Sequence, residues 1–182
     1  PCAIVMTPDI AIIIPAYNSA RFIAETLRTA QAQQGVRSEI ILVDGASGDD
    51  TVAVARAACP DLTVISEPDR GVSDARNKGL RRARADWVAF LDADDLWQPD
   101  KLARQLAVAR SEPDLALVFC DAWQFRGDER LLNSFLATRV DFPALPRHTV
   151  AGVEHGQVFD TDMAAAIMRT NYVVTTSTAI AH

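Results

Sequence analysis

The stretch WVAFLDADDLWQPDKL, residues 87–102, joins an apolar run directly to a group of acidic residues and then to a helix pattern. The run from Trp87 to Asp92 is apolar until its last residue, which is typical of a strand covered on both faces of a sheet. Asp92, Asp94 and Asp95 follow within four positions, and Pro99 stands where a helix can begin. The sequence therefore predicts a buried strand that carries negative charge to one point at its carboxyl end.

The same pairing of a buried strand with a helix recurs along the chain. Continuous apolar runs predict further strands at residues 10–16, 39–44, 62–66 and 115–120. Apolar residues at helical spacing predict helices at residues 19–33, 49–58, 72–83 and 99–110. This alternation favours an α/β fold, a Rossmann-like, doubly wound and mostly parallel sheet with helices on both faces.

The pattern becomes less regular after Cys120. Residues 140–156 contain Pro143 and Pro146 and predict an irregular segment. Residues 160–168 predict a helix, and the β-branched run at residues 173–181 predicts a strand. A long irregular segment in a compact domain is often functional, for example as a lid or a binding loop, although it could also be poorly ordered.

The composition bounds the class of protein. The chain has 182 residues, 49% hydrophobic and 23% charged, and we expect one globular unit. Its net charge of −6 argues against nucleic acid as a partner, because phosphate backbones are held by clustered lysine and arginine. No apolar run reaches the ~20 residues that span a bilayer, and the beginning of the sequence lacks the basic residues of a secretion signal. We therefore expect a cytoplasmic protein.

Polar residues gather where the predicted strands end, at residues 15–19, 44–51, 67–79 and 92–95. In an open parallel sheet, ligands bind beyond the carboxyl ends of the strands. Asp44 could accept hydrogen bonds from a base or ribose, or it could cap the next helix. Arg76 and Lys78 lie near the start of a helix and suit a diphosphate, although basic residues there could also form a solvated helix face.

The acids at Asp92, Asp94 and Asp95 are the sharpest signal in the sequence. Three neighbouring carboxylates repel one another unless a cation or hydrogen-bond donors compensate them, and Mg²⁺ and Mn²⁺ prefer oxygen ligands. The alternative is an acidic turn that caps the next helix. We expect a site for Mn²⁺ or Mg²⁺ that also holds the phosphates of a nucleotide.

Four motifs in order resemble the inverting glycosyltransferases of family 2, which have the GT-A fold. They are IIIPAYNSARFIAETLRT, EIILVDGASGDDT, SEPDRGVSDARNKGL and WVAFLDADDLWQPDKL. The resemblance lies in their order and spacing over residues 10–105. The resemblance implies transfer of a sugar from a nucleotide-sugar donor, commonly UDP-linked, to an acceptor hydroxyl with inversion and with a divalent metal. It also implies a role for each matching position. Pro15, Ala16, Tyr17 and Asn18 would line the nucleotide, Asp44 would meet the base, Arg76 and Lys78 would lie toward the diphosphate, Asp92 toward the ribose, and Asp94 at the metal.

The resemblance further divides the chain. Residues 1–122 would form the donor-binding half of one GT-A domain, and residues 123–182 the incomplete start of an acceptor-side half. The family's catalytic base lies in an acidic motif that nothing after Asp121 matches, since Glu154, Asp160 and Asp162 stand in different contexts. We therefore expect the base beyond His182, in a longer enzyme of which this is an N-terminal portion. A saccharide or lipid-linked acceptor is expected, and with it peripheral association with the inner face of the membrane.

Two other classes of function stay open on the sequence. A Mg²⁺-dependent nucleotidyltransferase also combines a doubly wound sheet with acidic metal ligands, but it normally has a Gly-rich phosphate loop after its first strand, which IIIPAYNSARF lacks. A non-catalytic nucleotide-sugar binding module would need no base. Titration with UDP in the presence and absence of Mn²⁺, followed by a test of turnover, separates the three.

Overall fold

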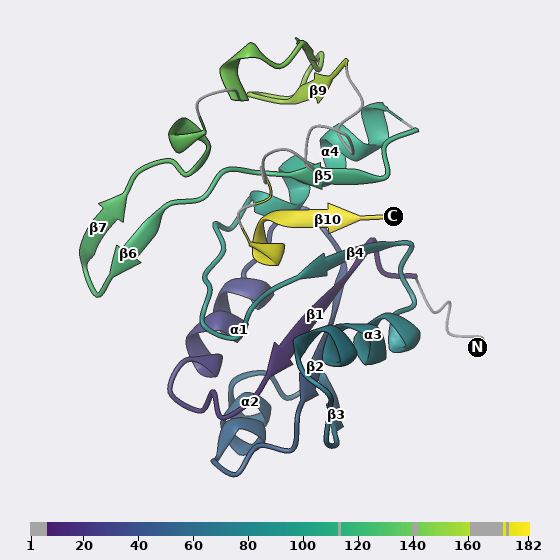
Figure 1. Ribbon diagram of the computed structural model, residues 1–182. Coiled ribbons are helices and arrows are strands. Elements are labelled where there is room, and N and C mark those ends of the chain that lie inside the picture. Colours follow the sequence, from purple (N-terminus) through teal and green to yellow (C-terminus); the bar gives the residue numbers. More distant parts are fainter. Residues whose placement is uncertain (1–6, 113, 140–141, 161–172, 174) are drawn as a thin grey trace.

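The computed structural model describes residues 7–112, 114–139, 142–160, 173 and 175–182 (Figure 1). The first part contains β1 (Ile10–Ala16), α1 (Ile23–Gln31), β2 (Ser38–Asp44), α2 (Thr51–Ala58), β3 (Thr63–Ser66), α3 (Val72–Arg82), β4 (Trp87–Phe90) and α4 (Lys101–Ser111). The second part contains β5 (Leu117–Phe119), β6 (Gln124–Arg126), β7 (Glu129–Leu132), β8 (Arg147–Thr149), β9 (Gln157–Phe159) and β10 (Ala179–Ala181), with 3-10 turns at Leu136–Thr138, Phe142–Ala144 and Thr176–Thr178. None of the helices in these ranges has the length and apolar character needed to cross a membrane.

One sheet forms the centre of the fold, with strand order β3-β2-β1-β4-β10-β5. The strands β1 to β4 pair in parallel, while β10 runs antiparallel to both of its neighbours, β4 and β5. The α/β prediction of a mostly parallel sheet is therefore confirmed. The insertion of β10, from the end of the chain, between β4 and β5 was not predicted.

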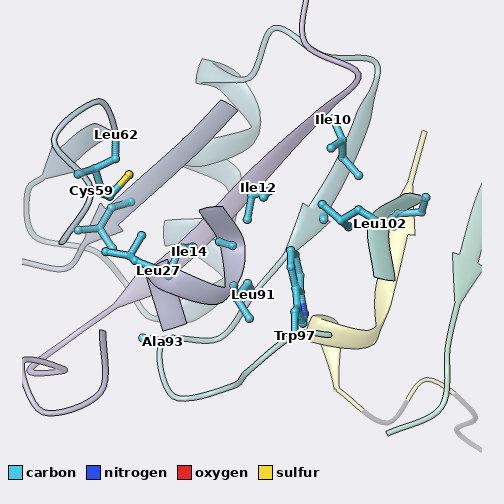
Figure 2. Close-up of a cluster of buried hydrophobic side chains, with 14 of the residues drawn as sticks. Ile10, Ile12, Ile14, Leu27, Cys59, Leu62, Leu91, Ala93, Trp97 and Leu102 are labelled. Carbon is cyan, nitrogen blue, oxygen red and sulfur yellow. The ribbon is translucent and has the colours of Figure 1, made fainter. Parts of the chain in front are cut away.

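The side chains of β1 alternate between two apolar cores, one on each face of the sheet. Ile12 and Ile14 pack in the larger core, which helices α1, α2 and α4 cover. Figure 2 shows this core, with Leu27 and Leu102 among its side chains. Ile13 faces the smaller core, which α3 covers. Because both faces of β1 are buried, its sequence is apolar at every position rather than at alternate ones. Helices on both faces of the sheet confirm the doubly wound architecture.

Helix α3 approaches β1 closely at Gly79. A Cβ atom on Gly79 would lie 2.3 Å from Ile13 Cγ2, which is closer than two carbon atoms can pack. The absence of a side chain therefore lets α3 lie directly on the centre of the sheet. This contact fixes the position of Arg76, one turn earlier on the same helix.

Pro15 lies in a central strand, although proline cannot donate a hydrogen bond to a sheet. The pairing of β1 with β4 ends at Ile13 and Phe90, whereas the pairing with β2 continues through Pro15 to Ala16. Pro15 therefore stands where the β4 side of β1 has no strand partner. The chain after β4 turns away at this point, which separates the ends of β1 and β4.

The segments after β5 differ in part from the sequence prediction. The predicted strand at residues 173–181 is only three residues long, Ala179–Ala181, because the preceding threonines form a 3-10 turn. The predicted irregular segment at residues 140–156 includes strand β8, which pairs with β9. Beyond Asp160, the predicted helix at residues 160–168 lies outside the described residues.

Candidate functional site

The candidate site lies where the order of the sheet reverses. The chain proceeds outward from β1 to β2 and β3, then returns across the sheet to place β4 on the other side of β1. The carboxyl ends of β1 and β4 therefore diverge at a point where α/β sheets bind ligands. Residues 15–18 follow β1 here, and residues 91–95, which we call the acidic turn, follow β4.

Arg76 and Asp92, which were predicted to share a ligand, contact each other directly. Arg76 Nη2 lies 2.8 Å from Asp92 Oδ1 and 2.7 Å from Thr176 Oγ1, and both side chains are partly buried. Charge-assisted hydrogen bonds of this kind are stronger than neutral ones and hold their partners in one geometry. Arg76 Nε is buried and has no hydrogen-bond partner within the described part of the chain.

The acidic turn is also held by a hydroxyl-rich turn from the other end of the chain. Thr175 Oγ1 lies 3.2 Å from Asp92 Oδ2 and 3.4 Å from Asp95 Oδ2. Ser177 Oγ accepts a hydrogen bond of 2.9 Å from the backbone N–H of Asp92, and Ser177 O accepts one of 2.8 Å from Trp97 Nε1. These residues were not predicted as part of the site, because the run TTST was interpreted as part of a strand.

Asp94 and Asp95 occupy different surroundings. Asp94 is exposed, and no described residue donates a hydrogen bond to it. Asp95 is partly buried, and burial together with the negative charges of Asp92 and Asp94 raises the pKa of its carboxyl group above the usual 3.8. Negative charge at this turn is thus only partly compensated by the protein itself.

The acidic turn fits a divalent ion that takes only part of its ligands from protein. The described residues contain no group of three or more histidine, cysteine, aspartate or glutamate side chains arranged to hold a metal. Mg²⁺ and similar ions are often bound by one or two carboxylates, with water and substrate phosphates as the other ligands. The unengaged carboxylate of Asp94 suits such a site, whereas the Asp92 carboxylate already accepts from Arg76 and two threonines.

The ends of β1 and β2 are tied together by short polar contacts. Asn18, with a positive φ of 49°, accepts a hydrogen bond of 2.9 Å from Gly48 N. Asp44 is only 1% exposed, and it accepts hydrogen bonds from the Ser47 and Ser66 hydroxyls. The Asp44 carboxylate is thus covered and engaged by neighbouring serines, and its predicted contact with a ligand stays a prediction.

The other predicted donor-site residues lie in three settings. Pro15 and Ala16 are buried in β1, so their side chains are covered by the sheet and helices. Tyr17 is 66% exposed and extends from the end of the strand. Lys78 lies 3.1 Å from Glu67 Oε1 and donates a hydrogen bond of 2.7 Å to Pro68 O. The structure therefore brings Arg76, but not Lys78, against the acidic turn.

A second carboxylate lies beside the end of β2. Asp69 Oδ2 would be 2.5 Å from a Cβ atom on Gly45, the residue that follows the strand. Asp69 Oδ1 also accepts a hydrogen bond of 2.8 Å from Gly71 N. The glycine leaves room for this side chain. The contact was not predicted, because 24 positions separate the two residues in the sequence.

A pocket of about 430 Å³ lies on the other side of the acidic turn, between the start of α4, the end of β5 and the Thr176–Thr178 turn. We call it the aromatic pocket, because its walls include Trp97, Trp123, Phe125 and Phe135. Asp95 and Thr175 line the same pocket, so it adjoins the acidic turn. Its volume is in the range of small-molecule sites.

The acidic turn thus lies at the switch point of a doubly wound sheet, the place where α/β proteins bind ligands, and the aromatic pocket adjoins it. The family described as Glycosyl transferase family 2 matches residues 11–173, and the chain belongs to this family. The resemblance inferred from the four motifs is therefore confirmed.

Several relatives have related sequences. The succinoglycan biosynthesis protein ExoO of Rhizobium meliloti is 42% identical over 109 residues, which are 58% of this chain and 31% of that protein. The putative glycosyltransferase EpsH of Bacillus subtilis is 30% identical over 157 residues, covering 84% of this chain and 44% of that protein. The chain thus spans about a third to a half of the length of these relatives.

Solved structures agree with the fold. The mannosyltransferase PcManGT of Pyrobaculum calidifontis, in complex with GDP-Man and Mn²⁺, matches with a TM-score of 0.58 and 34% identity over 64% of this chain and 36% of that chain. TarS 1-349 of S. aureus, in complex with UDP-GlcNAc, matches with a TM-score of 0.51 and 26% identity over 58% of this chain and 31% of that chain. These neighbours confirm the GT-A type of the fold.

Proposed function

We propose that this chain forms the donor-binding part of a metal-dependent glycosyltransferase that transfers a sugar from a nucleotide-sugar, with UDP as the expected nucleotide, to an acceptor hydroxyl with inversion. The observation that carries the proposal is the acidic turn at the switch point, where Asp94 is free to bind while Arg76 and Thr175 hold its neighbours. PcManGT binds GDP-Man with Mn²⁺ and TarS binds UDP-GlcNAc, which supports this class of donor.

The residues of the site have distinct proposed roles. Asp94 would hold Mn²⁺ or Mg²⁺, which offsets the charge that grows on a leaving diphosphate. Arg76 keeps Asp92 toward the nucleotide side, and the exposed Tyr17 and Asn18 offer contacts to the nucleotide beyond β1. Asp44 stabilises the adjoining loop through Ser47.

In an inverting transfer, the acceptor oxygen forms a bond to the anomeric carbon as the bond to the diphosphate breaks, and a carboxylate takes the hydroxyl proton. We assign no residue of this chain as that base. Asp121, which lines the aromatic pocket, already accepts hydrogen bonds of 2.9 Å from Phe135 N and Leu136 N. We keep the proposal that residues 1–122 form the donor half and that residues 123–182 begin the acceptor half. The acceptor is proposed to be a saccharide, free or lipid-linked.

The test compares two carboxylates that flank β4 at its opposite ends. Asp94 follows the carboxyl end of β4, whereas Asp86 is exposed just before the amino end of the same strand. UDP and GDP are titrated calorimetrically with and without Mn²⁺ into the wild type, Asp94→Asn and the control Asp86→Asn. We expect Mn²⁺ to strengthen nucleotide binding in the wild type and the control only.

Transfer by the full-length protein is measured in parallel with UDP-sugars. Loss of one group that stabilises developing charge typically lowers the rate by ~10²–10³, and we expect this for Asp94→Asn. Equal Mn²⁺-dependent binding by Asp94→Asn and Asp86→Asn would refute the proposed metal ligand. Metal-dependent binding without turnover would favour a nucleotide-sugar binding module instead.

A further inference from the structure

A lysine is buried at the wall of the aromatic pocket. Lys101, the first residue of α4, is 9% exposed and lines the pocket. Its Nζ donates a hydrogen bond of 2.6 Å to Gln105 Oε1 and lies 4.2 Å from the centre of the Trp97 ring. Among the described residues, no carboxylate lies within ion-pair distance of this ammonium group. An ammonium group has three donors, so two of them are left for a ligand or solvent.

Gln105 holds this lysine in a fixed position. Its amide nitrogen donates hydrogen bonds of 3.3 Å to Val118 O and 2.8 Å to Thr178 O, which orients the amide oxygen toward Lys101. Gln105 is itself 4% exposed. The cation is thus placed by a buried side chain that is bonded to β5 and to the Thr176–Thr178 turn, rather than by a flexible surface contact.

The other charged groups of the pocket already have partners. Arg104 Nε lies 2.7 Å from Asp100 Oδ2, and Asp95 lies beside the Thr175 hydroxyl. Asp121 accepts hydrogen bonds from backbone N–H groups. A buried ammonium without an anionic partner is unfavourable for the free protein. It is favourable when a ligand brings the missing negative charge.

The walls indicate what kind of molecule brings this charge. Trp123 and Phe125 are 41% and 45% exposed, so their rings are available to pack against a ligand. Flat aromatic rings pack well against the apolar C–H faces of sugar rings. The pocket adjoins the acidic turn through Asp95, on the side away from the ends of β1 and β2. That position suits the acceptor rather than the nucleotide.

We propose that the aromatic pocket binds an acceptor sugar that carries an anionic group, and that Lys101 contacts this group. The inference rests on the proposed glycosyl transfer, and it names the chemical class of the acceptor. A carboxylate of a uronic acid and a phosphate on a sugar present the same negatively charged oxygens to an ammonium group. Lys101 acts here as a specificity-determining residue, because it does not touch the atoms that react.

The test measures the preference for anionic sugars in the full-length protein. Glucuronic acid, glucose 6-phosphate and glucose are titrated while the fluorescence of the pocket tryptophans and ligand-detected NMR signals are followed. We expect at least one of the two anionic sugars to bind about tenfold more tightly than glucose, since hydrogen bonds to charged groups are the stronger ones. The preferred sugar identifies the group as carboxylate or phosphate.

Two variants distinguish the role of Lys101 from a general effect of charge. Lys101→Met keeps the length of the side chain and should reduce the preference to less than about twofold. Arg110→Met removes a cation from the other end of α4, where Arg110 is bound to Asp9, and should keep the preference. Circular dichroism confirms folding of both. Equal binding of the three sugars by the wild type, or an unchanged preference in Lys101→Met, would overturn the proposal.

The pH profile gives a second readout. Burial lowers the pKa of Lys101 from 10.5 to about 8, so the preference of the wild type should fall as the pH rises through about 8. The other ionisable groups that line the pocket are Asp95, Arg104, Cys120 and Asp121, and burial raises the pKa of the Cys120 thiol above its usual 9.0. A preference for anionic sugars that is independent of pH from 7 to 10 also contradicts the role of Lys101.

Failure of Mn²⁺-dependent UDP binding would instead reject the proposed function, since the proposed nucleotide site lies on the other side of the acidic turn from the aromatic pocket.

Discussion

Lys101→Met is expected to raise the free energy of unfolding at pH 7, although it removes a hydrogen-bonded side chain. Lys101 is 9% exposed, and burial lowers the pKa of its ammonium group from 10.5 to about 8. A shift of this size corresponds to about 3 kcal/mol against the charged folded state, at roughly 1.4 kcal/mol per unit. Methionine has a similar length and no charge, so this unfavourable contribution disappears.

The size of the effect depends on pH in a defined direction. Because the folded pKa is below the unfolded one, the unfavourable contribution is complete below about pH 8, declines as the pH rises toward 10.5 and is absent above it. The substitution also leaves Gln105 Oε1 without its 2.6 Å donor, which costs about 1 kcal/mol. The variant should therefore be about 2 kcal/mol more stable than the wild type at pH 7 and about 1 kcal/mol less stable near pH 10.5.

Urea unfolding of both proteins at pH 7 and at pH 10.5 measures this double difference, and the dependence of the unfolding free energy on urea concentration should be equal for the two proteins. Arg110→Met is the matched control, because Arg110 is on the same helix and its side chain is 60% exposed. Its effect should be within about 0.5 kcal/mol and independent of pH. A Lys101→Met protein that is less stable than the wild type at pH 7, or a difference that does not change with pH, would refute the reasoning.

Three further substitutions test the packing and the site. Gly79→Ala should lower the free energy of unfolding by about 2 kcal/mol in urea titrations, because its Cβ would lie 2.3 Å from Ile13 Cγ2. This loss should outweigh the better helix propensity of alanine, and an unchanged stability would contradict the close contact. Arg76→Met should weaken Mn²⁺-dependent UDP binding about tenfold in calorimetry, because it removes the ion pair with Asp92. Arg81 is exposed on the same helix, so Arg81→Met should leave the affinity for UDP unchanged. Equal affinities of the two variants for UDP would disprove the role of the ion pair. Thr175→Val should weaken the same binding and Thr175→Ser should preserve it, since only the hydroxyl reaches Asp92 and Asp95; indistinguishable variants would rule this out.

The local pattern of the sequence was sufficient for the elements of the N-terminal part. Burial on both faces imposes a continuous apolar run on β1 and β2, and helices that cover one face need apolar residues at helical spacing, so both can be recognised residue by residue. Element ends were less well predicted. The strand expected to reach Asp92 ends at Phe90, because the pairing of β1 with β4 stops there.

The sequence by itself determined the α/β class, the family and the location of the acidic turn, because these depend on residues that are close together along the chain. Only the tertiary structure decided which residues meet that turn. Thr175 reaches Asp92 from 83 positions away, and β10 enters the sheet from the end of the chain. Likewise, Lys101 occupies a helix position that is ordinary for a surface lysine and becomes buried only when β5 and the Thr176–Thr178 turn pack over α4. The physical reason is that periodicity records whether a residue is covered, whereas the identity of its neighbours depends on how distant segments pack.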